Sequence, residues 1–383
     1  MLAIPWRGLA ILPEAPASLT RARTVVIAAG GTGGHLFPAQ ALSVALAARG
    51  WRIVLATDTR GGAHAASFPA QRVVTLPAAT IGRRDPVSLV RAGLTILAGV
   101  MAGRAALGEE EPAVVVGFGG YPSLPALLAA VSLGRRTVIH EQNAVFGRAN
   151  RLLAPLVTQV ACAFPVLANA PRRVQASKVV TGNPVRPEIA ALSGLGYHPP
   201  QDEIRLLITG GSQGARLLSE LMPRALAALP DRLRARLKVE QQTRPESLES
   251  AQQVYADARI AAEVAPFFDN MAARLSRAHL VIGRAGASTV TELAVAGRPA
   301  VLAPLAIALD NDQGRNAAIL EAAGGAVAVR EADLTAPMMT ALIQSLLDDP
   351  PRLGRMAAAS ARLGRPDAAE RLADLVERVA GRS

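Results

Sequence analysis

Short apolar runs alternate along the chain with longer segments in which apolar residues recur about every three to four positions. The short runs are typical of strands buried on both faces, and the longer periodic segments are typical of helices. The pattern predicts strands at 24–29, 51–56, 71–75, 113–117, 136–140, 157–162, 204–209, 237–241, 260–264, 279–282, 299–302 and 326–329. Helices are predicted at 38–49, 87–106, 122–133 and 147–153, and further helices separate the later strands. Such alternation requires parallel sheets covered by helices on both faces, so the fold class is α/β.

Two of these strands end in doubled glycines followed by a hydroxyl residue, which makes an internal repeat. The strand at 24–29 leads into Gly30–Gly34, and the strand at 204–209 leads into Gly210–Gly214. Each copy predicts a tight turn that needs the positive φ of glycine, followed by a helix whose free N-terminal N–H groups can bind an anion. The copies lie about 180 residues apart, which is the length of one α/β domain. Two similar domains therefore face a cleft for two substrates.

A chain of 383 residues is too long for one ordinary core and long enough for two. The segment 182–187, with prolines at 184 and 187, predicts a linker in which the prolines stop any helix and stiffen the hinge. We therefore expect a flexible extension at 1–23, a first domain at 24–183, a second domain at 184–364 and a C-terminal segment at 365–383. Residues 367–380 are helical with no strand after them, which is consistent with a helix that returns to the first domain.

The chain contains 41 basic and 30 acidic residues, a net charge of +11, but only 3% aromatic residues. Nucleic-acid binding is not favoured, because base stacking needs aromatic side chains and the arginines are scattered in pairs. Two explanations of the many arginines stay open. They can keep the protein soluble, or they can attract an anionic membrane or a phosphorylated substrate. The single cysteine, Cys162, cannot form a disulfide within the chain, which favours a reducing compartment.

Two stretches almost without charge, 25–48 and 117–134, have about the length of a membrane span. Glycines and prolines interrupt both, so a buried strand, a loop and a helix explain them better. Residues 1–23 contain no continuous apolar core of signal-peptide length. We therefore expect a cytoplasmic protein.

A glycine turn after a strand raises the question of a dinucleotide site, in which Asp58 at the end of the second strand would bind a ribose. The G-x-G-x-x-G fingerprint fails, because Leu36 takes the place of its third glycine. The chain also contains no G-K-[ST] phosphate loop. Neither dinucleotide binding nor ATP hydrolysis is supported.

His35 follows the first glycine turn, in a segment with few other polar groups. An imidazole there can accept a proton at neutral pH, as a general base does. The alternative is a structural histidine at the start of a helix, hydrogen-bonded to the backbone. The position alone leaves both readings open.

The segment Arg284–Glu292 begins a second candidate site, because its helix starts with small residues and a phosphate can approach the backbone N–H groups. Glu292 lies one turn after Ser288 on the same face, where a carboxylate can accept hydrogen bonds from a ribose diol. Thr289 and Glu292 also have the spacing of a capping box, in which the glutamate only satisfies the first N–H of its own helix. The spacing fits both readings.

Asp310-Asn311-Asp312-Gln313, with Asn316 after it, opens a further predicted helix. Two aspartates at this spacing can hold Mg²⁺ on a diphosphate. We favour the alternative that the helix dipole stabilises acidic residues in the first turn, because no third ligand is recognisable. The five histidines and one cysteine show no zinc spacing, so no metal site is predicted.

Both glycine turns, His140-Glu141-Gln142-Asn143, 182–186, 284–292 and 312–316 occur in an order found in one family. On these motifs, the chain from about Arg23 to its C-terminus resembles the MurG family. These bacterial enzymes move N-acetylglucosamine (GlcNAc) from UDP-GlcNAc to undecaprenyl-diphospho-muramoyl-pentapeptide (lipid I), which gives lipid II for peptidoglycan. The resemblance implies a GT-B fold of two Rossmann-like domains, the first binding lipid I and the second UDP-GlcNAc. It also implies a peripheral enzyme on the cytoplasmic face of the plasma (inner) membrane, with no cofactor and with cell-wall synthesis and division proteins as partners.

The resemblance assigns roles to residues that match the family motifs. Ser212 and Gln213 contact the diphosphate, Phe268 binds the uracil through its backbone beside Met271, Glu292 binds the ribose, Arg186 lies near UDP, Asn143, Asp312 and Gln313 lie near the sugar hydroxyls, and Thr32 and His35 face the acceptor. The full set assigned to donor binding is Thr32, Gly33, Asn143, Arg186, Ser212, Gln213, Phe268, Met271, Ala287, Ser288, Thr289, Glu292, Asp312 and Gln313. To the acceptor and the membrane we assign Gly34 and Tyr121, together with Ile81, Arg83, Arg84 and Arg91 from a segment that mixes arginines with aliphatic residues.

The implied reaction is one displacement, in which the muramoyl 4-hydroxyl attacks the anomeric carbon and inverts it. His35 is the candidate general base, and helix N-termini together with Arg186 take the place of a metal in holding the departing diphosphate. Two departures from the family pattern affect the sugar-side loop. The family usually carries an amide or a histidine at or beside Asp312, and often proline and histidine in place of Ala306 and Ile307.

Two other classes share parts of this pattern. A UDP-sugar 2-epimerase has the same fold and a soluble donor, but no lipid acceptor, and usually more carboxylates and histidines around the sugar. A non-enzymatic nucleotide-sugar sensor would keep Glu292 and Ser212 and would not need His35 or the first glycine turn, both of which are present.

The segment 81–91 mixes arginines with aliphatic residues and leads into a helix that carries Leu94, Ile96 and Leu97. A basic rim around an apolar patch fits an anionic membrane surface. In the alternative, the aliphatics are the buried face of the helix and the arginines are its solvated edge.

Overall fold

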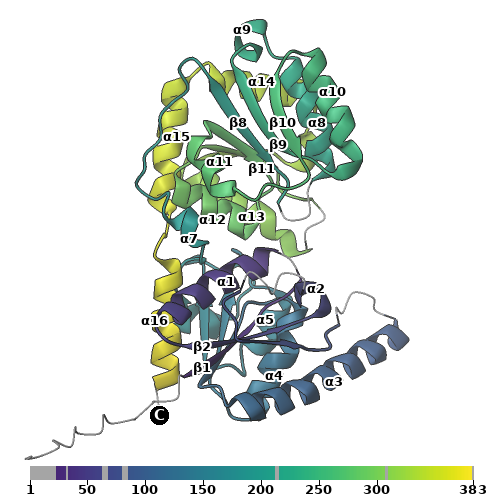
Figure 1. Cartoon of the computed structure of the whole chain (residues 1–383), viewed down its shortest axis with the longest axis vertical. Helices are drawn as coiled ribbons and strands as arrows, with labels where there is room; N and C mark the ends of the chain where they lie inside the picture. Colours follow the sequence, from purple (N-terminus) through teal and green to yellow (C-terminus); the bar gives the residue numbers. More distant parts are fainter. Residues whose placement is uncertain are drawn as a thin grey trace, which may run out of the picture.

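The computed structural model describes residues 23–31, 33–62, 68–79, 85–211, 215–306 and 309–381, which form two α/β domains (Figure 1). In the described residues, the first domain holds a seven-stranded sheet of order β3-β2-β1-β4-β5-β6-β7, and the second a six-stranded sheet of order β10-β9-β8-β11-β12-β13. The strand pairings of both sheets are parallel. The predicted fold class is confirmed.

Each strand predicted from the pattern is present, with bounds that shift by two residues at most. The strands are β1 (Thr24–Ala28), β2 (Arg52–Thr57), β3 (Arg72–Thr75), β4 (Val114–Gly117), β5 (Thr137–Glu141), β6 (Gln159–Cys162), β7 (Val179–Val180), β8 (Ile204–Thr209), β9 (Leu237–Gln242), β10 (Ala261–Ala265), β11 (Leu280–Gly283), β12 (Ala300–Leu302) and β13 (Ala326–Ala328). The prediction missed β7, because a strand of two residues has no periodicity.

The helices of the first domain are α1 (Gly33–Ala48), α2 (Thr59–Gly62), α3 (Pro86–Glu110), η2 (Tyr121–Ser123), α4 (Leu124–Ser132), α5 (Arg148–Leu153) and α6 (Arg172–Ser177), joined by α16 (Ala368–Gly381). Those of the linker and the second domain are α7 (Pro187–Ala190), α8 (Arg216–Ala227), α9 (Asp231–Arg234), η3 (Pro245–Ser247), α10 (Leu248–Asp257), α11 (Met271–Arg277), α12 (Ala287–Ala296), η4 (Leu309–Asn311), α13 (Asp312–Ala322), η5 (Glu331–Asp333), α14 (Ala336–Leu347) and α15 (Pro350–Leu363).

Alternate residues of β1 serve two cores, one on each face of the first sheet. Val25 and Ile27 pack with α1 and α16, and Val26 and Ala28 pack with α4. The C-terminal helix α16 lies along the first domain, where it packs on α1, β4 and β5 (Figure 1). Arg49, just after α1, forms ion pairs with three acidic residues of α16. A helix encoded at the end of the chain thus completes the first core.

The second sheet also has a core on each face. Val185 of the linker and Ile189 of α7 are buried in one of them. The expectation that prolines exclude helix from the linker is wrong at Pro187, which begins α7, because the fixed φ of proline suits the first position of a helix.

Both glycine turns have the predicted left-handed backbone, with φ of 85° at Gly31 and 76° at Gly211. Helix α1 begins at Gly33, five residues before the predicted start. Glycine lowers helix propensity, so the pattern understated the helix. The early start brings the first turn of α1 to the second domain, where α1 packs against α12 (Figure 1).

Candidate active site

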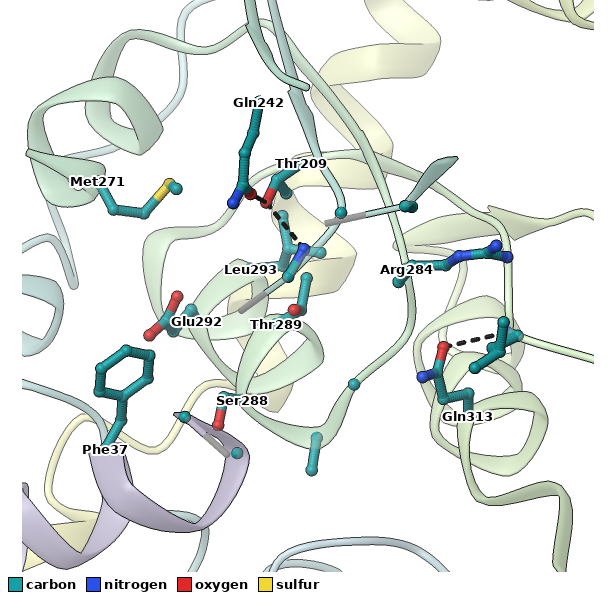
Figure 2. A pocket seen from close by; sticks show the side chains of 18 of the residues that line it. Phe37, Thr209, Gln242, Met271, Arg284, Ser288, Thr289, Glu292, Leu293 and Gln313 are labelled. Atoms are coloured by element: carbon teal, nitrogen blue, oxygen red, sulfur yellow. Dashed lines mark hydrogen bonds between the residues drawn. The ribbon is translucent and has the colours of Figure 1, made fainter. Parts of the chain in front are cut away.

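A cleft of about 790 Å³ lies between the two domains. Residues from the first turn of α1, the segment after β5, the linker and the carboxyl edge of the second sheet line it. The predicted residues that the structure brings together here are Gly33, Gly34, His35, Asn143, Arg186, Phe268, Met271, Ala287, Ser288, Thr289, Glu292, Asp312 and Gln313. Figure 2 shows α12 opposite α1, with Ser288 and Glu292 facing the helix that carries Phe37.

His35 is the third residue of α1, and its Nδ1 lies 2.8 Å from the backbone oxygen of Phe118. A carbonyl oxygen only accepts hydrogen bonds, so Nδ1 carries the proton and Nε2 is the nitrogen that can accept one. Gln142 donates from Nε2 to the same oxygen at 2.8 Å. His35 is therefore hydrogen-bonded to the backbone, as the structural reading expects. The partner, Phe118, lies 83 positions away along the chain, and the bond leaves Nε2 as the nitrogen that a general base needs.

Glu141 and His140 lie buried directly behind this wall of the cleft. Glu141 accepts hydrogen bonds from the backbone N–H groups of Asn143 and Gly147, at 3.1 and 2.8 Å, and from Nδ2 of Asn150 at 2.9 Å. Burial nevertheless raises the pKa of Glu141. Burial lowers the pKa of His140 to about 4, and its Nε2 donates to the backbone oxygen of Gly182 at 2.9 Å. The carboxylate fixes the loop that presents Asn143, and the imidazole ties β5 to the linker.

On the opposite wall, α12 begins at Ala287 without a side-chain cap, and its N-terminus faces the cleft. The buried Oγ of Ser288 has no hydrogen-bond partner among the described residues. Uncapped N–H groups and an unused hydroxyl at a helix N-terminus form a site for an anion.

The capping-box reading of Thr289 and Glu292 is wrong. The helix starts two residues before Thr289, and Glu292 turns away from its N-terminus towards the linker. There its Oε1 lies 3.3 Å from Nη2 of Arg186. Burial raises the pKa of Glu292, and Arg186 opposes that shift. The Arg186 guanidinium also lies 4.7 Å from the ring centre of Phe37, so it bridges α1 and α12.

Phe268 is buried beside the cleft, and the guanidinium of Arg274 lies 3.7 Å from its ring centre. Arg274 donates from both Nη atoms to the carboxylate of Glu263, at 2.8 and 2.6 Å. This packing fixes the segment between β10 and α11, whose residues Phe267 and Phe268 line the cleft with Met271.

At the start of α13, Asp312 and Gln313 line the far end of the cleft. Asp312 accepts from the backbone N–H of Gln313 at 2.8 Å, and burial raises its pKa. Gln313 accepts from the backbone N–H of Leu305 at 3.0 Å (Figure 2). The two aspartates of the D-x-D pattern do not converge, because Asp310 pairs with Arg148 and Arg151 of the first domain instead.

Two predicted residues lie away from the cleft. Tyr121 is at the start of η2, one residue after Gly120, where an added Cβ would lie 3.3 Å from Nε2 of His35. Arg91 is exposed on α3. The predicted residues Thr32, Ile81, Arg83, Arg84, Ser212 and Gln213, and the extension at 1–22, lie outside the described residues.

The apolar residues of α3 are distributed unlike those of an ordinary surface helix. Its buried positions are Ala92, Gly99, Gly103, Leu107 and Glu110. Leu94 and Leu97 are 63% and 57% exposed, and Ile96 is half-buried. The reading in which these aliphatics are the buried face of the helix is therefore wrong for Leu94 and Leu97.

Sequence reasoning missed Phe37 and Glu331 as cleft residues, and it gave no role of their own to Gln142 and to Arg284, the first residue of a candidate segment. Arg284 donates to the backbone oxygen of Ala303 at 3.0 Å and to Oε2 of Glu331 at 2.7 Å. An arginine that directly follows a buried strand was the available signal for Arg284. Nothing local marks Glu331, which the chain brings from η5.

Comparison with known proteins agrees with this geometry. Residues 25–162 match the glycosyltransferase family 28 N-terminal domain, and residues 205–372 match the glycosyltransferase family 28 C-terminal domain. The crystal structure of MurG from Acinetobacter baumannii aligns with a TM-score of 0.75 at 32% identity, covering 93% of this chain and 99% of that one. A putative UDP-N-acetylglucosamine 2-epimerase from Listeria monocytogenes aligns with a TM-score of 0.63 over 92% of this chain and 95% of its own, and at 15% identity it shows the fold alone.

The fold and the cleft thus define a glycosyltransferase of family 28, with the GT-B arrangement of two Rossmann-like domains. A relative from Phenylobacterium zucineum is named UDP-N-acetylglucosamine–N-acetylmuramyl-(pentapeptide) pyrophosphoryl-undecaprenol N-acetylglucosamine transferase. It is 60% identical over 360 residues, which span 94% of this chain and 99% of the relative. The chain belongs to the MurG family.

Proposed function

We propose that the protein transfers GlcNAc from UDP-GlcNAc to the 4-hydroxyl of the muramoyl sugar in lipid I, giving lipid II. Membership of the MurG family supports both substrates. The observation that carries the chemistry is one cleft with a proton-accepting histidine on the first-domain wall and an uncapped helix start on the second-domain wall. The first domain is accordingly the acceptor domain, and the second the donor domain.

Inversion at the anomeric carbon needs a base on the face opposite to the leaving diphosphate. His35 enters the cleft from α1, opposite α12. As the acceptor oxygen attacks, Nε2 of His35 takes the hydroxyl proton, and the Phe118 carbonyl stabilises the imidazolium through its bond to Nδ1. Gln142 donates a second hydrogen bond to that carbonyl and so helps to hold it in place.

The departing diphosphate needs positive charge, which the N-terminus of α12, the Ser288 hydroxyl and Arg186 supply. These donors are already in place, so we propose that transfer requires no metal cofactor and persists in excess chelator. Activity abolished by EDTA and restored by Mg²⁺ would contradict this and would make Asp310 and Asp312 ligands.

The membrane-facing surface in this proposal is the outer side of α3, which lies on the outside of the acceptor domain (Figure 1). By length and composition, α3 is long and apolar enough to cross a membrane. Its small residues pack on α4 and on the segment before α3, where a Cβ on Gly99 would lie 2.0 Å from the backbone oxygen of Pro77. Five exposed apolar residues three or four positions apart run along the other side, at Val87, Val90, Leu94, Leu97 and Met101. A helix packed on one side and apolar on the other fits a protein lying on the bilayer, with Arg91 towards anionic headgroups.

Transfer of labelled sugar from UDP-GlcNAc to a lipid I analogue tests the function directly. The expected result is labelled lipid II, with UDP released only when the acceptor is present. A 2-epimerase would act on UDP-GlcNAc without the acceptor, and a sensor would bind it without turnover. Either result would overturn the proposal.

A further inference from the structure

The start of α13 is attached to the acceptor domain by an ion-pair cluster of Asp310, Arg148 and Arg151. Oδ2 of Asp310 lies 3.3 Å from Nε of Arg148 and 3.1 Å from Nη2 of Arg151. Both arginines belong to α5, three positions apart and therefore on one face of that helix. The Asp310 side chain is 25% exposed, so solvent only partly screens its charge. We call these three residues the Asp310 clamp.

The backbone at the clamp is held in a conformation that it would not adopt freely. Asp310 and Asn311 both have a left-handed backbone, with φ of 63° and 53°. Asp and Asn tolerate this region better than other non-glycine residues, but two in succession need surrounding contacts to hold them. The ion pairs to α5 are such contacts.

A second attachment lies one turn into α13, at Asn316. Its side chain is fully buried, and its Oδ1 accepts from the backbone N–H of Ala144 at 2.8 Å. Its Nδ2 donates to Oδ1 of Asn143 at 3.0 Å and to the backbone oxygen of Ala285 at 3.1 Å. Asn316 thus joins the acceptor domain to the segment that begins α12.

Asp312 and Gln313, the two cleft residues of this helix, lie between the two attachments. Any movement of α5 away from the second domain pulls on the residues that precede them. The diphosphate end of the cleft, at the N-terminus of α12, also contacts the acceptor domain, through α1 and through Asn316 at Ala285, whereas the ion pairs of the clamp lie at the start of α13. Loss of the clamp should therefore loosen the sugar end of the cleft, while these other contacts still hold the diphosphate end.

We propose that Asp310, held by Arg148 and Arg151, is a positioning residue that assembles the sugar end of the donor site only when the domains are in contact. The inference rests on the proposed function, because it takes the ligand at Asp312 and Gln313 to be the sugar of UDP-GlcNAc. It predicts that the clamp affects binding of the sugar and leaves binding of UDP unchanged.

The test compares binding of UDP and of UDP-GlcNAc by calorimetry in Asp310→Asn, which keeps the shape and the tolerated backbone. We expect affinity for UDP-GlcNAc to fall about three- to tenfold, the range for a partly exposed ion-pair cluster, with affinity for UDP unchanged. Arg148→Gln/Arg151→Gln should cause the same loss, and adding Asp310→Asn to it should cause no further loss. High salt should reduce the difference between the wild type and Asp310→Asn.

Asp348→Asn is the matched control, because it breaks an ion pair to Arg232 within the second domain, away from the cleft. It should leave both affinities unchanged. Equal losses for UDP and UDP-GlcNAc, additive losses in the combined variant, or no loss in Asp310→Asn would each overturn the inference. A wild type that binds UDP-GlcNAc but never transfers the sugar would instead overturn the proposed function, and the binding comparison would still test the clamp.

Discussion

The two walls of the cleft are built from the same unit, a buried strand, a glycine turn and a helix, but they carry different kinds of chemistry. On the acceptor wall, α1 starts directly after the turn and brings His35 into the cleft as that wall's only ionisable lining residue among those the structure describes. On the donor wall, the second glycine turn leads to α8, and the uncapped helix start that charged side chains surround belongs to another helix, α12, which follows β11. In the proposed function, the first wall moves a proton and the second holds a charged leaving group.

The largest expected effect separates these two tasks. His35→Ala should lower kcat about 10²- to 10⁴-fold, the usual contribution of a general base, and leave the Kd for UDP-GlcNAc within a few fold. Steady-state kinetics and calorimetry on the same preparation measure the two quantities. His198→Ala, at an exposed histidine outside the cleft, is the control and should match the wild type. Native turnover in His35→Ala with saturating substrates would return His35 to a structural role.

The second prediction concerns pH and the acceptor domain. The folded protein holds the pKa of His140 at about 4, below its ordinary value of 6.5. Between these values the unfolded chain binds the proton and the folded protein does not, so the free energy of unfolding falls as pH drops from 6.5 to 4. The loss amounts to about 3 kcal/mol.

Denaturant titrations at several pH values measure this loss. In His140→Gln, which has no titrating group there, the decrease between neutral pH and pH 4 should be smaller by about that amount. Glu141 acts in the opposite direction, because its raised pKa favours the protonated folded state, but it is common to both proteins. Parallel pH profiles would contradict the buried neutral state of His140.

The third prediction concerns the donor wall. If Glu292 binds the ribose, Glu292→Ala removes a charge-assisted hydrogen bond worth about 1.5 to 3 kcal/mol, so donor affinity should fall roughly ten- to a hundredfold. Turnover at saturating donor should change less than in His35→Ala. Glu188→Ala removes another carboxylate near Arg186, 3.8 Å from its Nε and outside the cleft lining, and should leave donor affinity unchanged. Unchanged donor affinity in Glu292→Ala would remove Glu292 from the ribose site.

Much of the fold was predictable, because strand periodicity and glycine turns are local properties of the sequence. The sequence could not show whether Glu292 caps its own helix, because a capping box and a ribose site share one spacing. The start of α12 at Ala287 excludes the capping box. The pairing of Asp310 with α5 was also beyond reach, because the partners lie 159 and 162 positions apart. Periodicity showed that α3 has two faces. It could not show which face is buried, because α3 buries its glycines and exposes its large aliphatic residues, the opposite of an ordinary surface helix.

The smallest expected effect concerns the membrane. It tests whether the protein contacts the bilayer through the acceptor domain and not through the donor domain. Arg91→Glu, at the exposed start of α3, should weaken binding to vesicles of anionic lipid by about 1 to 2 kcal/mol, because each basic residue near the surface contributes about 1 kcal/mol. Transfer to a water-soluble acceptor analogue should be unchanged. Arg355→Glu, at a residue of the donor domain that is 70% exposed and outside the cleft lining, is the matched control and should bind vesicles like the wild type. Sedimentation with vesicles at low and physiological salt measures both variants, and the difference should shrink as salt screens the headgroups. If the two variants lose equal affinity, net charge governs binding, and the two domains do not differ in their contact with the membrane.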